Sequence, residues 1–332
     1  MKGKYEIKVE NRNVAFSFSI KRKFTIIKGD SAKGKSYFCN MLLDKNSVKI
    51  DCKANLIVVT DIEVFKSLIK ESGNILILDE GIDVFKSIFM YSKQLTVSDN
   101  YFIFITRHYL RGVPYSVREM YSFVSKKDDS VSLNKEPKTI TTLKPLYKDN
   151  CTVDKIEGIV ITEDTQAGND FYRRCLPECT VYPKKGSNKG GKGNVKFHFL
   201  QLLEDGKLLN KKVFIVVDSA AFGDEIEELM SVINISMKDV DVCPNEVVVL
   251  LPESFEYLIC GAKVGIDDNR LSKTYDYCDA KSYNTWEKYY TDLVSDVLDT
   301  YKNTKAKYSK KVLCKEVMSL SSKMLLVLYK KC

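Results

Sequence analysis

Short apolar runs recur through the first part of the chain and alternate with segments of helical spacing. Residues 5–28 alternate between apolar and polar positions, which predicts a β-hairpin leading into a more buried third strand. Further strands are predicted at 55–60, 74–78 and 101–106, and helices at 61–71 and 83–93. Buried strands that alternate with helices predict an α/β domain with a parallel sheet over residues 1–125.

A second α/β pattern follows a polar stretch. Residues 126–155 are polar and contain two prolines, so we expect a linker with room for a short β-hairpin. Apolar strands and helices alternate again over 156–262, which predicts a second α/β domain. Residues 263–332 are lysine-rich with helical spacing, and we expect them to form a helical C-terminal extension.

Length and composition fit two soluble domains. The chain has 332 residues, of which 44% are hydrophobic, so two sizeable cores can be buried. No apolar run approaches the roughly 18 residues of a membrane span, and the N-terminus lacks the apolar core of a signal peptide. We therefore expect a cytoplasmic protein with no membrane partner.

Cysteine spacing and charge add two further points. The ten cysteines are scattered without a CxxC pair, and there are only two histidines, so we expect reduced thiols and no structural zinc. The net charge is +8, and the stretch 184–212 is rich in lysine. Such a stretch either attracts phosphates or is a solubilising surface loop, and composition alone favours the loop.

One motif carries specific chemistry. It matches the phosphate-loop pattern G-x-x-x-x-G-K-[ST] at every fixed position, with a predicted strand before it and a helix after it. The glycines let backbone N–H groups face an anion, the lysine contacts the β- and γ-phosphates, and the serine ligates Mg²⁺. We expect ATP or GTP with Mg²⁺ to bind through Gly29, Asp30, Ser31, Ala32, Lys33, Gly34, Lys35 and Ser36.

An acidic pair follows the apolar strand 74–78. Asp79 at the carboxyl end of this strand would hold Mg²⁺, and Glu80 would polarise the attacking water. The alternative is an ordinary helix-capping pair. The strand 101–106 ends in Thr106, which is our candidate for contacting the γ-phosphate, with His108 second.

Residues 5–108 resemble the additional-strand P-loop ATPases with a catalytic glutamate. The opening hairpin before the phosphate loop is similar to the start of ABC-type ATPase domains. The chain departs from these because little sequence separates Lys35 from Asp79, and because no LSGGQ-like signature is present. The resemblance implies ATP hydrolysis but does not extend to the head-to-tail dimer of ABC proteins.

Acids also follow three predicted strands of the second domain. Glu163, Asp218 and Glu253 each come after such a strand, and the carboxyl ends of parallel strands share one edge. Converging carboxylates bind Mg²⁺ and support phosphodiester chemistry, whereas the plainer reading is that these acids cap helices.

The layout of the second domain resembles a Toprim domain, whose pattern is a glutamate after one strand and D-x-D-x-x-G after a later one. Glu163, Asp218 and Gly223 match, which implies that Glu163 and Asp218 are catalytic metal ligands. Ala220 stands in place of the second aspartate. The missing metal ligand would come from Asp224, Glu225 or Glu256. Otherwise the domain would have lost cleavage and kept only binding.

A P-loop ATPase domain followed by a Toprim-like domain is similar to the domain order of the OLD (overcoming lysogenization defect) family of ATP-regulated nucleases. This similarity implies an ATPase that gates nucleic-acid binding or cleavage, in phage defence or on a mobile element. The alternative is a nucleotide-dependent switch or assembly protein whose second domain is a non-catalytic partner-binding module. A homo-oligomer or a partner protein fits both hypotheses, and a small-molecule kinase fits less well.

Overall fold

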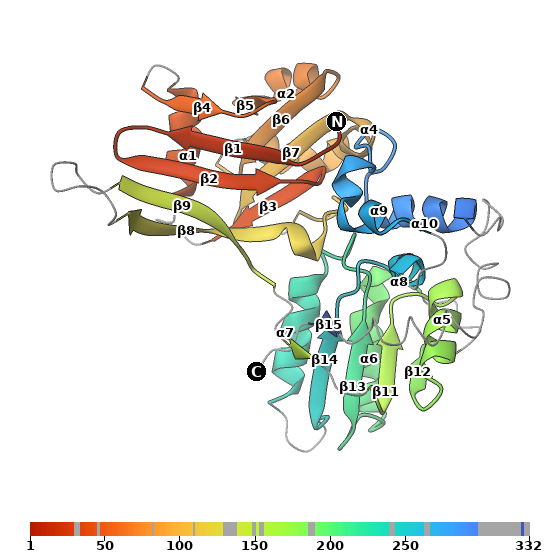
Figure 1. Ribbon diagram of the computed structural model, residues 1–332. Coiled ribbons are helices and arrows are strands. Elements are labelled where there is room, and N and C mark those ends of the chain that lie inside the picture. The colour runs from red at the N-terminus through yellow and green to blue at the C-terminus, as the bar shows by residue number, and fades with distance from the viewer. Residues whose placement is uncertain are drawn as a thin grey trace. The chain divides into compact units, whose positions relative to one another are not determined.

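The described part of the chain forms two compact units. The computed structural model (Figure 1) describes residues 1–29, 34–44, 47–81, 83–108, 110–128, 138–147, 151–152, 156–184, 190–238, 243–261, 266–297 and 327–328. The first unit comprises Met1–Leu146 and Lys273–Thr285, and the second comprises Tyr147–Ser272 and Trp286–Cys332. The short segment Lys273–Thr285, which we call the returning segment, thus belongs to the first unit although it follows most of the second in sequence.

The first unit is built on a mixed sheet whose described strands have the order β4-β1-β2-β9-β8-β3-β7-β6-β5. The strands β8, β3, β7, β6 and β5 run parallel, as the sequence pattern predicts for an α/β fold. Their bounds are β1 Tyr5–Glu10, β2 Val14–Ile20, β3 Phe24–Lys28, β4 Lys49–Asp51, β5 Asn55–Val58, β6 Ser72–Asp79, β7 Asp99–Thr106, β8 Met120–Asp128 and β9 Lys138–Pro145.

Two hairpins extend the parallel strands. The expected hairpin β1–β2 is present, and its Tyr5 pairs with Ile20. A second hairpin, β8–β9, occupies part of the segment 126–155, where a linker is predicted. Strand β8 pairs with β3 and strand β9 pairs with β2, so this hairpin joins the opening hairpin to the parallel strands.

The helices of the first unit follow its strands closely. Helix α2 begins where the Asp61 side chain accepts hydrogen bonds from the backbone N–H groups of Glu63 and Val64, as expected for an N-cap. The helix predicted at 83–93 is instead broken into α3, a 3₁₀ turn and α4. The bounds are α1 Lys35–Leu43, α2 Ile62–Leu68, α3 Val84–Ser87, η1 Ile88–Tyr91, α4 Ser92–Val97 and η2 Val117–Glu119.

An aromatic cluster fixes α1 against the sheet. The ring of Phe38 on α1 lies 5.0 Å from that of Phe16 and 5.7 Å from those of Phe18 and Phe123. All four side chains are buried, and ring pairs at such distances stabilise a packed core. The two hairpins therefore hold the helix that follows the phosphate-loop motif of the sequence.

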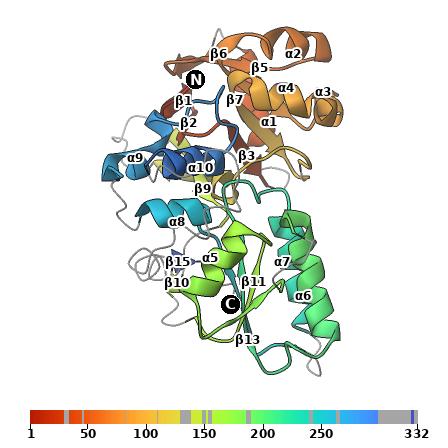
Figure 2. The ribbon, with the colours of Figure 1, turned by 90° about the vertical axis from the view of Figure 1, so that its right-hand side faces the viewer.

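The second unit contains the parallel sheet β12-β11-β13-β14. Helices α6 and α7 cover one face of this sheet and α5 the other (Figure 2). Gly158 has a φ of 114°, and a Cβ there would lie 2.5 Å from the carbonyl oxygen of Lys212, so only glycine fits at the start of β11. The bounds are β11 Ile159–Thr162, α5 Ala167–Cys175, β12 Thr180–Tyr182, η3 Lys192–Asn194, α6 Val195–Glu204, β13 Lys212–Val216, α7 Ile226–Ser236, β14 Glu246–Leu250 and α8 Phe255–Gly261.

The expected helical extension is helical only in part. Helices α9 (Asp268–Ser272) and α10 (Trp286–Val297) lie within it, with a 3₁₀ turn, η4, at Thr274–Asp276. The prediction is wrong at Val327–Leu328, which form strand β15 and pair with β10 (Cys151–Thr152). Backbone pairing with a distant strand overrides the local helical spacing there. Among the described residues, no helix combines the length and apolarity needed to cross a bilayer.

Backbone and side-chain hydrogen bonds hold the returning segment to the rest of the first unit. The N–H of Gly3 donates to the carbonyl oxygen of Tyr275, and that of Ala280 donates to Met1. The buried side chain of Lys23 donates to the carbonyl oxygens of Thr96 and Ala280. Burial lowers the pKa of Lys23 to about 7, despite the opposing charge of Asp279.

We expect Lys23→Met to change the pH dependence of stability. The unfolded chain keeps this lysine protonated to about pH 10.5, whereas the folded chain releases the proton near pH 7. The stability linked to Lys23 therefore rises between about pH 7 and 10.5, and it is lost as the pH falls from 10.5 to 7. In Lys23→Met, the slope of the unfolding free energy against pH in this window should fall by at most about 1.4 kcal/mol per pH unit.

Chemical denaturation of the full chain at several pH values measures this slope. Lys49→Met is the matched control, because Lys49 is an exposed lysine of the same unit. Equal slopes for the wild type and Lys23→Met would contradict the expectation.

Candidate functional site

The carboxyl ends of β3, β7 and β6 meet at one edge of the first sheet. Lys28 at the end of β3 pairs with Thr106 at the end of β7, and Asp79 at the end of β6 pairs with Ile105. Gly29, the first residue of the phosphate-loop motif, directly follows Lys28. The register thus brings the start of this motif, the acidic pair and Thr106 to the same edge.

The described part of the motif begins helix α1. Gly34 precedes the helix with a φ of 82°, a left-handed conformation that favours glycine. Lys35 is buried at the first position of α1, and its Nζ donates a hydrogen bond to the carbonyl oxygen of Gly29. Ser36 is exposed at the same helix end. The predicted residues Asp30, Ser31, Ala32 and Lys33 lie outside the described residues.

Asp79 is linked to the helix that follows the motif. One of its carboxylate oxygens accepts a hydrogen bond from the N–H of Gly81 at 3.1 Å. The thiol of Cys39, one turn after Lys35 on α1, also hydrogen-bonds to Asp79. Burial, and then the charge of Asp79, raises the pKa of Cys39, so this cysteine stays a thiol. Sequence reasoning missed the role of Cys39, although its helical spacing from Lys35 placed it on the same helix face.

Glu80 is held by the end of β7. One carboxylate oxygen accepts hydrogen bonds from the N–H of Arg107 and from the hydroxyl of Thr106, the latter at 3.3 Å. The other forms an ion pair with the Arg107 guanidinium at 3.0 Å. The Thr106 hydroxyl also contacts the backbone of His108. Glu80 and Thr106 are therefore both at this edge, and Arg107 fixes the orientation of the glutamate.

In the second unit, Glu163 and Asp218 lie at neighbouring strand ends. In the sheet, β11 lies between β12, which follows it in the chain, and β13, so the strand order reverses at β11. Open α/β sheets commonly bind ligands at such a switch point. Glu163 follows β11 and Asp218 follows β13. The backbone N–H of Asp218 donates to a carboxylate oxygen of Glu163 at 3.2 Å, so the structure brings this predicted pair together.

The surroundings of Glu163 are acidic, and its side chain is only partly exposed to solvent. Burial first, and then the negative charge of Glu287, raises the pKa of Glu163 to about 7. The hydrogen bond from Asp218 and the charge of Lys192 oppose this shift. Glu287 lies on α10, more than a hundred residues away in sequence, and no local signal could have pointed to it. The phenol of Tyr172 on α5 is buried near Glu163, Asp218 and Glu256.

The acids considered as replacements for the position of Ala220 are engaged elsewhere. Asp224 pairs with Lys192 at 2.6 Å, Glu225 lies 3.7 Å from Lys196, and Glu256 accepts a hydrogen bond from Thr291. Across the residues that the structure describes, no group of three histidine, cysteine or carboxylate side chains is arranged to hold a metal ion.

Part of the lysine-rich stretch reaches this acidic edge. The N–H of Gly191 donates to the carbonyl oxygen of Glu163 at 3.0 Å. A Cβ on Gly190 would lie 2.6 Å from the hydroxyl oxygen of Thr165, so the chain passes very close to the edge there. Residues 185–189 of the stretch lie outside the described residues. Lys192 is thus the described lysine that contacts the edge, through Asp224.

Comparisons with protein-family models and with curated protein sequences find no match to this chain. Function is therefore argued from the site itself.

We expect Glu287→Gln to lower the pKa of Glu163, because it removes a neighbouring negative charge while the burial remains. Carboxylate ¹³C NMR titration of the full chain measures this pKa, and the resonance is identified by its loss in Glu163→Gln. Asp292→Asn is the matched control, because Asp292 is an exposed acid on the same helix. An unchanged pKa in Glu287→Gln, or an equal change in the control, would contradict the assignment of this charge.

Proposed function

We propose that the first unit is a Mg²⁺-dependent ATP hydrolase and that its nucleotide state controls nucleic-acid binding or cleavage by the second unit. One observation carries the first half of this proposal. The start of the phosphate-loop motif, Lys35, the acidic pair and Thr106 gather at the carboxyl edge of three adjacent parallel strands. This is the arrangement that phosphoryl transfer requires of a protein.

The strand order supports the same proposal. Strand β7 lies between β3, which precedes the phosphate loop, and β6, which carries the acidic pair. An intervening strand in this position is the additional strand for which the P-loop class resembled here is named. The lack of an LSGGQ-like signature leaves the mode of assembly open between a homo-oligomer and a partner protein.

The residues present fit a nucleotide with Mg²⁺. Gly34 has the left-handed backbone that opens α1, and the N–H groups in the first turn of a helix favour an anion. Lys35 would contact the phosphates, while Ser36 and Asp79 would hold Mg²⁺, which neutralises phosphate charge when bound. Glu80 would accept a proton from the attacking water, and Arg107 keeps its carboxylate oriented.

The proposal predicts separate effects of two substitutions. Lys35→Ala should weaken ATP binding by roughly 10- to 150-fold, since a charge-assisted contact is lost. Glu80→Gln should leave ATP affinity nearly unchanged and lower kcat by about 10²- to 10⁴-fold, because a general base is lost. Calorimetric titration and phosphate release measure the two quantities. Unchanged affinity and hydrolysis in Lys35→Ala would refute the nucleotide site.

Two glycines with the same backbone conformation provide a control for folding. Gly34 and Gly73 both have a φ of 82°, and a Cβ on either would meet no close contact. Gly34→Ala and Gly73→Ala should therefore each lower the unfolding free energy by about 1–2 kcal/mol. Only Gly34→Ala should also weaken ATP binding. Equal loss of binding in both variants would mean that destabilisation alone explains the effect.

For the second unit, Glu163 and Asp218 support binding of a phosphate backbone. Mg²⁺ in proteins is commonly held by one or two carboxylates together with substrate phosphates, and these two side chains lie at one switch point of the sheet. Lys192 adds a positive charge at the same edge. The pair fits an ion shared with a bound phosphate rather than an ion enclosed by protein ligands alone.

A specific observation favours the alternative, in which the second unit is a non-catalytic partner-binding module. Ala220 replaces the second aspartate of the Toprim pattern, and each acid that would compensate is already engaged with a lysine or a threonine. In this alternative, the first unit still binds and hydrolyses ATP as proposed, and only the cleavage of nucleic acid by the second unit is dropped from the proposal.

Variants of the pair separate the two possibilities. Glu163→Gln and Asp218→Asn are tested for nicking of plasmid DNA and for binding of a labelled DNA duplex, each with Mg²⁺ or Mn²⁺, alongside ATP hydrolysis. If the unit is a nuclease, both variants should lose cleavage and retain ATP hydrolysis. Glu204→Gln, an exposed acid on α6, is the control. If the wild-type protein neither nicks nor binds DNA, the part of the proposal that concerns nucleic acid is refuted.

A further inference from the structure

A cavity of about 400 Å³ lies at the amino ends of the parallel strands of the first sheet, at the opposite end of these strands from the proposed nucleotide site. Its wall includes Ser72 and Asp99 at the amino ends of β6 and β7, whereas the acidic pair and Thr106 stand at their carboxyl ends. Each of these strands has eight residues, which places the two sites about 25 Å apart. The cavity is therefore separate from the proposed nucleotide site, and its volume is in the range that small-molecule pockets have.

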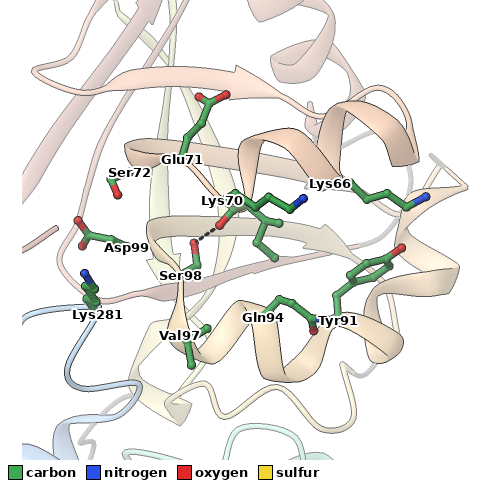
Figure 3. A pocket seen from close by; sticks show the side chains of 11 residues that line it. Lys66, Lys70, Glu71, Ser72, Tyr91, Gln94, Val97, Ser98, Asp99 and Lys281 are labelled. Carbon is green, nitrogen blue, oxygen red and sulfur yellow. Dashed lines mark hydrogen bonds between the residues drawn. The ribbon is translucent and has the colours of Figure 1, made fainter.

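The floor of the cavity is held by a satisfied hydrogen-bond network. The Ser98 hydroxyl donates to the carbonyl oxygen of Ile69 at 3.1 Å (Figure 3). The buried amide of Asn100 donates to the hydroxyl of Ser98 and to the carbonyl oxygens of Leu68 and Glu71. These contacts fix the end of α2 against the start of β7. The cavity therefore keeps its shape without a ligand.

The walls offer an apolar surface and an aromatic ring. Ile69 is buried in the floor, and Val97 is 67% exposed at the rim. The ring of Tyr91 is held in an edge-on contact with Phe65, with a centroid distance of 5.3 Å. Figure 3 shows Tyr91 at one end of the cavity and Lys281 with Asp99 at the other. Apolar side chains and a fixed aromatic ring in one lining favour a ligand with an aromatic or branched apolar body.

The charges around the cavity favour an anion. Lys66 is neutralised by Glu63 at 2.6 Å, and Asp99 by the N-terminal ammonium. In the described part of the chain, the side chains of Lys70 and Lys281 form no ion pair, and Glu71 is the remaining acid of the lining. The balance of one acid against two lysines leaves a single positive charge for a ligand to neutralise.

We propose that this cavity is a second ligand site, which takes a small organic monoanion with an aromatic or branched apolar body. Lys281 belongs to the returning segment, whereas Lys70 follows α2. A ligand held by both lysines joins the returning segment to the body of the first unit. Because the cavity lies about 25 Å from the proposed nucleotide site, its ligand would act as an effector rather than as a substrate.

The test uses a pair of probes that differ in charge. The first is 8-anilinonaphthalene-1-sulfonate, an aromatic monoanion, and the second is N-phenyl-1-naphthylamine, which has the same body without the sulfonate. Fluorescence titration of the full chain should show one sulfonate per chain and binding of the neutral probe roughly tenfold weaker. Equal affinities for the two probes would overturn the assignment to an anion.

Charge-reversal variants locate the site. Lys70→Glu and Lys281→Glu should each weaken binding of the sulfonate roughly tenfold and leave the neutral probe unaffected. Lys49→Glu, an exposed lysine of the same unit outside the cavity, is the matched control. An equal loss in Lys49→Glu would show a general charge effect and refute the site.

Hydrogen exchange provides a second readout. The sulfonate should slow exchange in the returning segment of the wild type and of Lys35→Ala, but not of Lys281→Glu. If Lys35→Ala still shows this protection, the cavity is distinct from the nucleotide site, and the two proposals can fail independently. Binding without added protection of the returning segment would overturn the link to that segment.

Discussion

The parallel register of β3, β7 and β6 is the constraint on which the first unit depends. Parallel strands end at a common edge, so residues that follow different strands meet although they are far apart in the chain. Backbone pairing of Lys28 with Thr106 and of Asp79 with Ile105 sets which residues meet. A shift of one residue in either ladder would turn these side chains to the other face and separate the lysine from the acids.

Helix α1, which follows the phosphate-loop motif, is fixed from two sides. Phe38 packs into the aromatic cluster made by the two hairpins, while Cys39 contacts Asp79 at the end of β6. Lys35 precedes both on the same helix, so its position follows from theirs. The hairpins carry none of the proposed catalytic residues, but by packing against α1 they help to position the ammonium group of Lys35.

Electrostatics distinguish the two candidate sites. Glu80 forms an ion pair with Arg107, whereas Glu163 lies near other acids and has a pKa near 7. A positive ion or a phosphate-bound cation would relieve the repulsion around Glu163 more than it would at Glu80. The charge of Lys192 already opposes that repulsion in part. This contrast is consistent with hydrolysis in the first unit and binding in the second.

Local sequence determined the strands, most of the helices and the candidate residues at strand ends. Strand burial and helix periodicity are written in neighbouring residues, and the phosphate-loop motif is contiguous, so a pattern suffices to predict them. It was also enough to pair Glu163 with Asp218, because parallel strands share an edge. It failed at Val327–Leu328, where a partner strand far away in the chain decides the conformation.

The tertiary structure alone decided the contacts between distant residues. The ion pair of Glu80 with Arg107, the charge of Glu287 beside Glu163, and the addition of the returning segment to the first unit all join residues with no local relation. Which of several exposed lysines lines a cavity, and which acid is already neutralised, depends on distances of a few ångströms. Such distances are set by packing across the whole fold, and a one-dimensional pattern does not contain them.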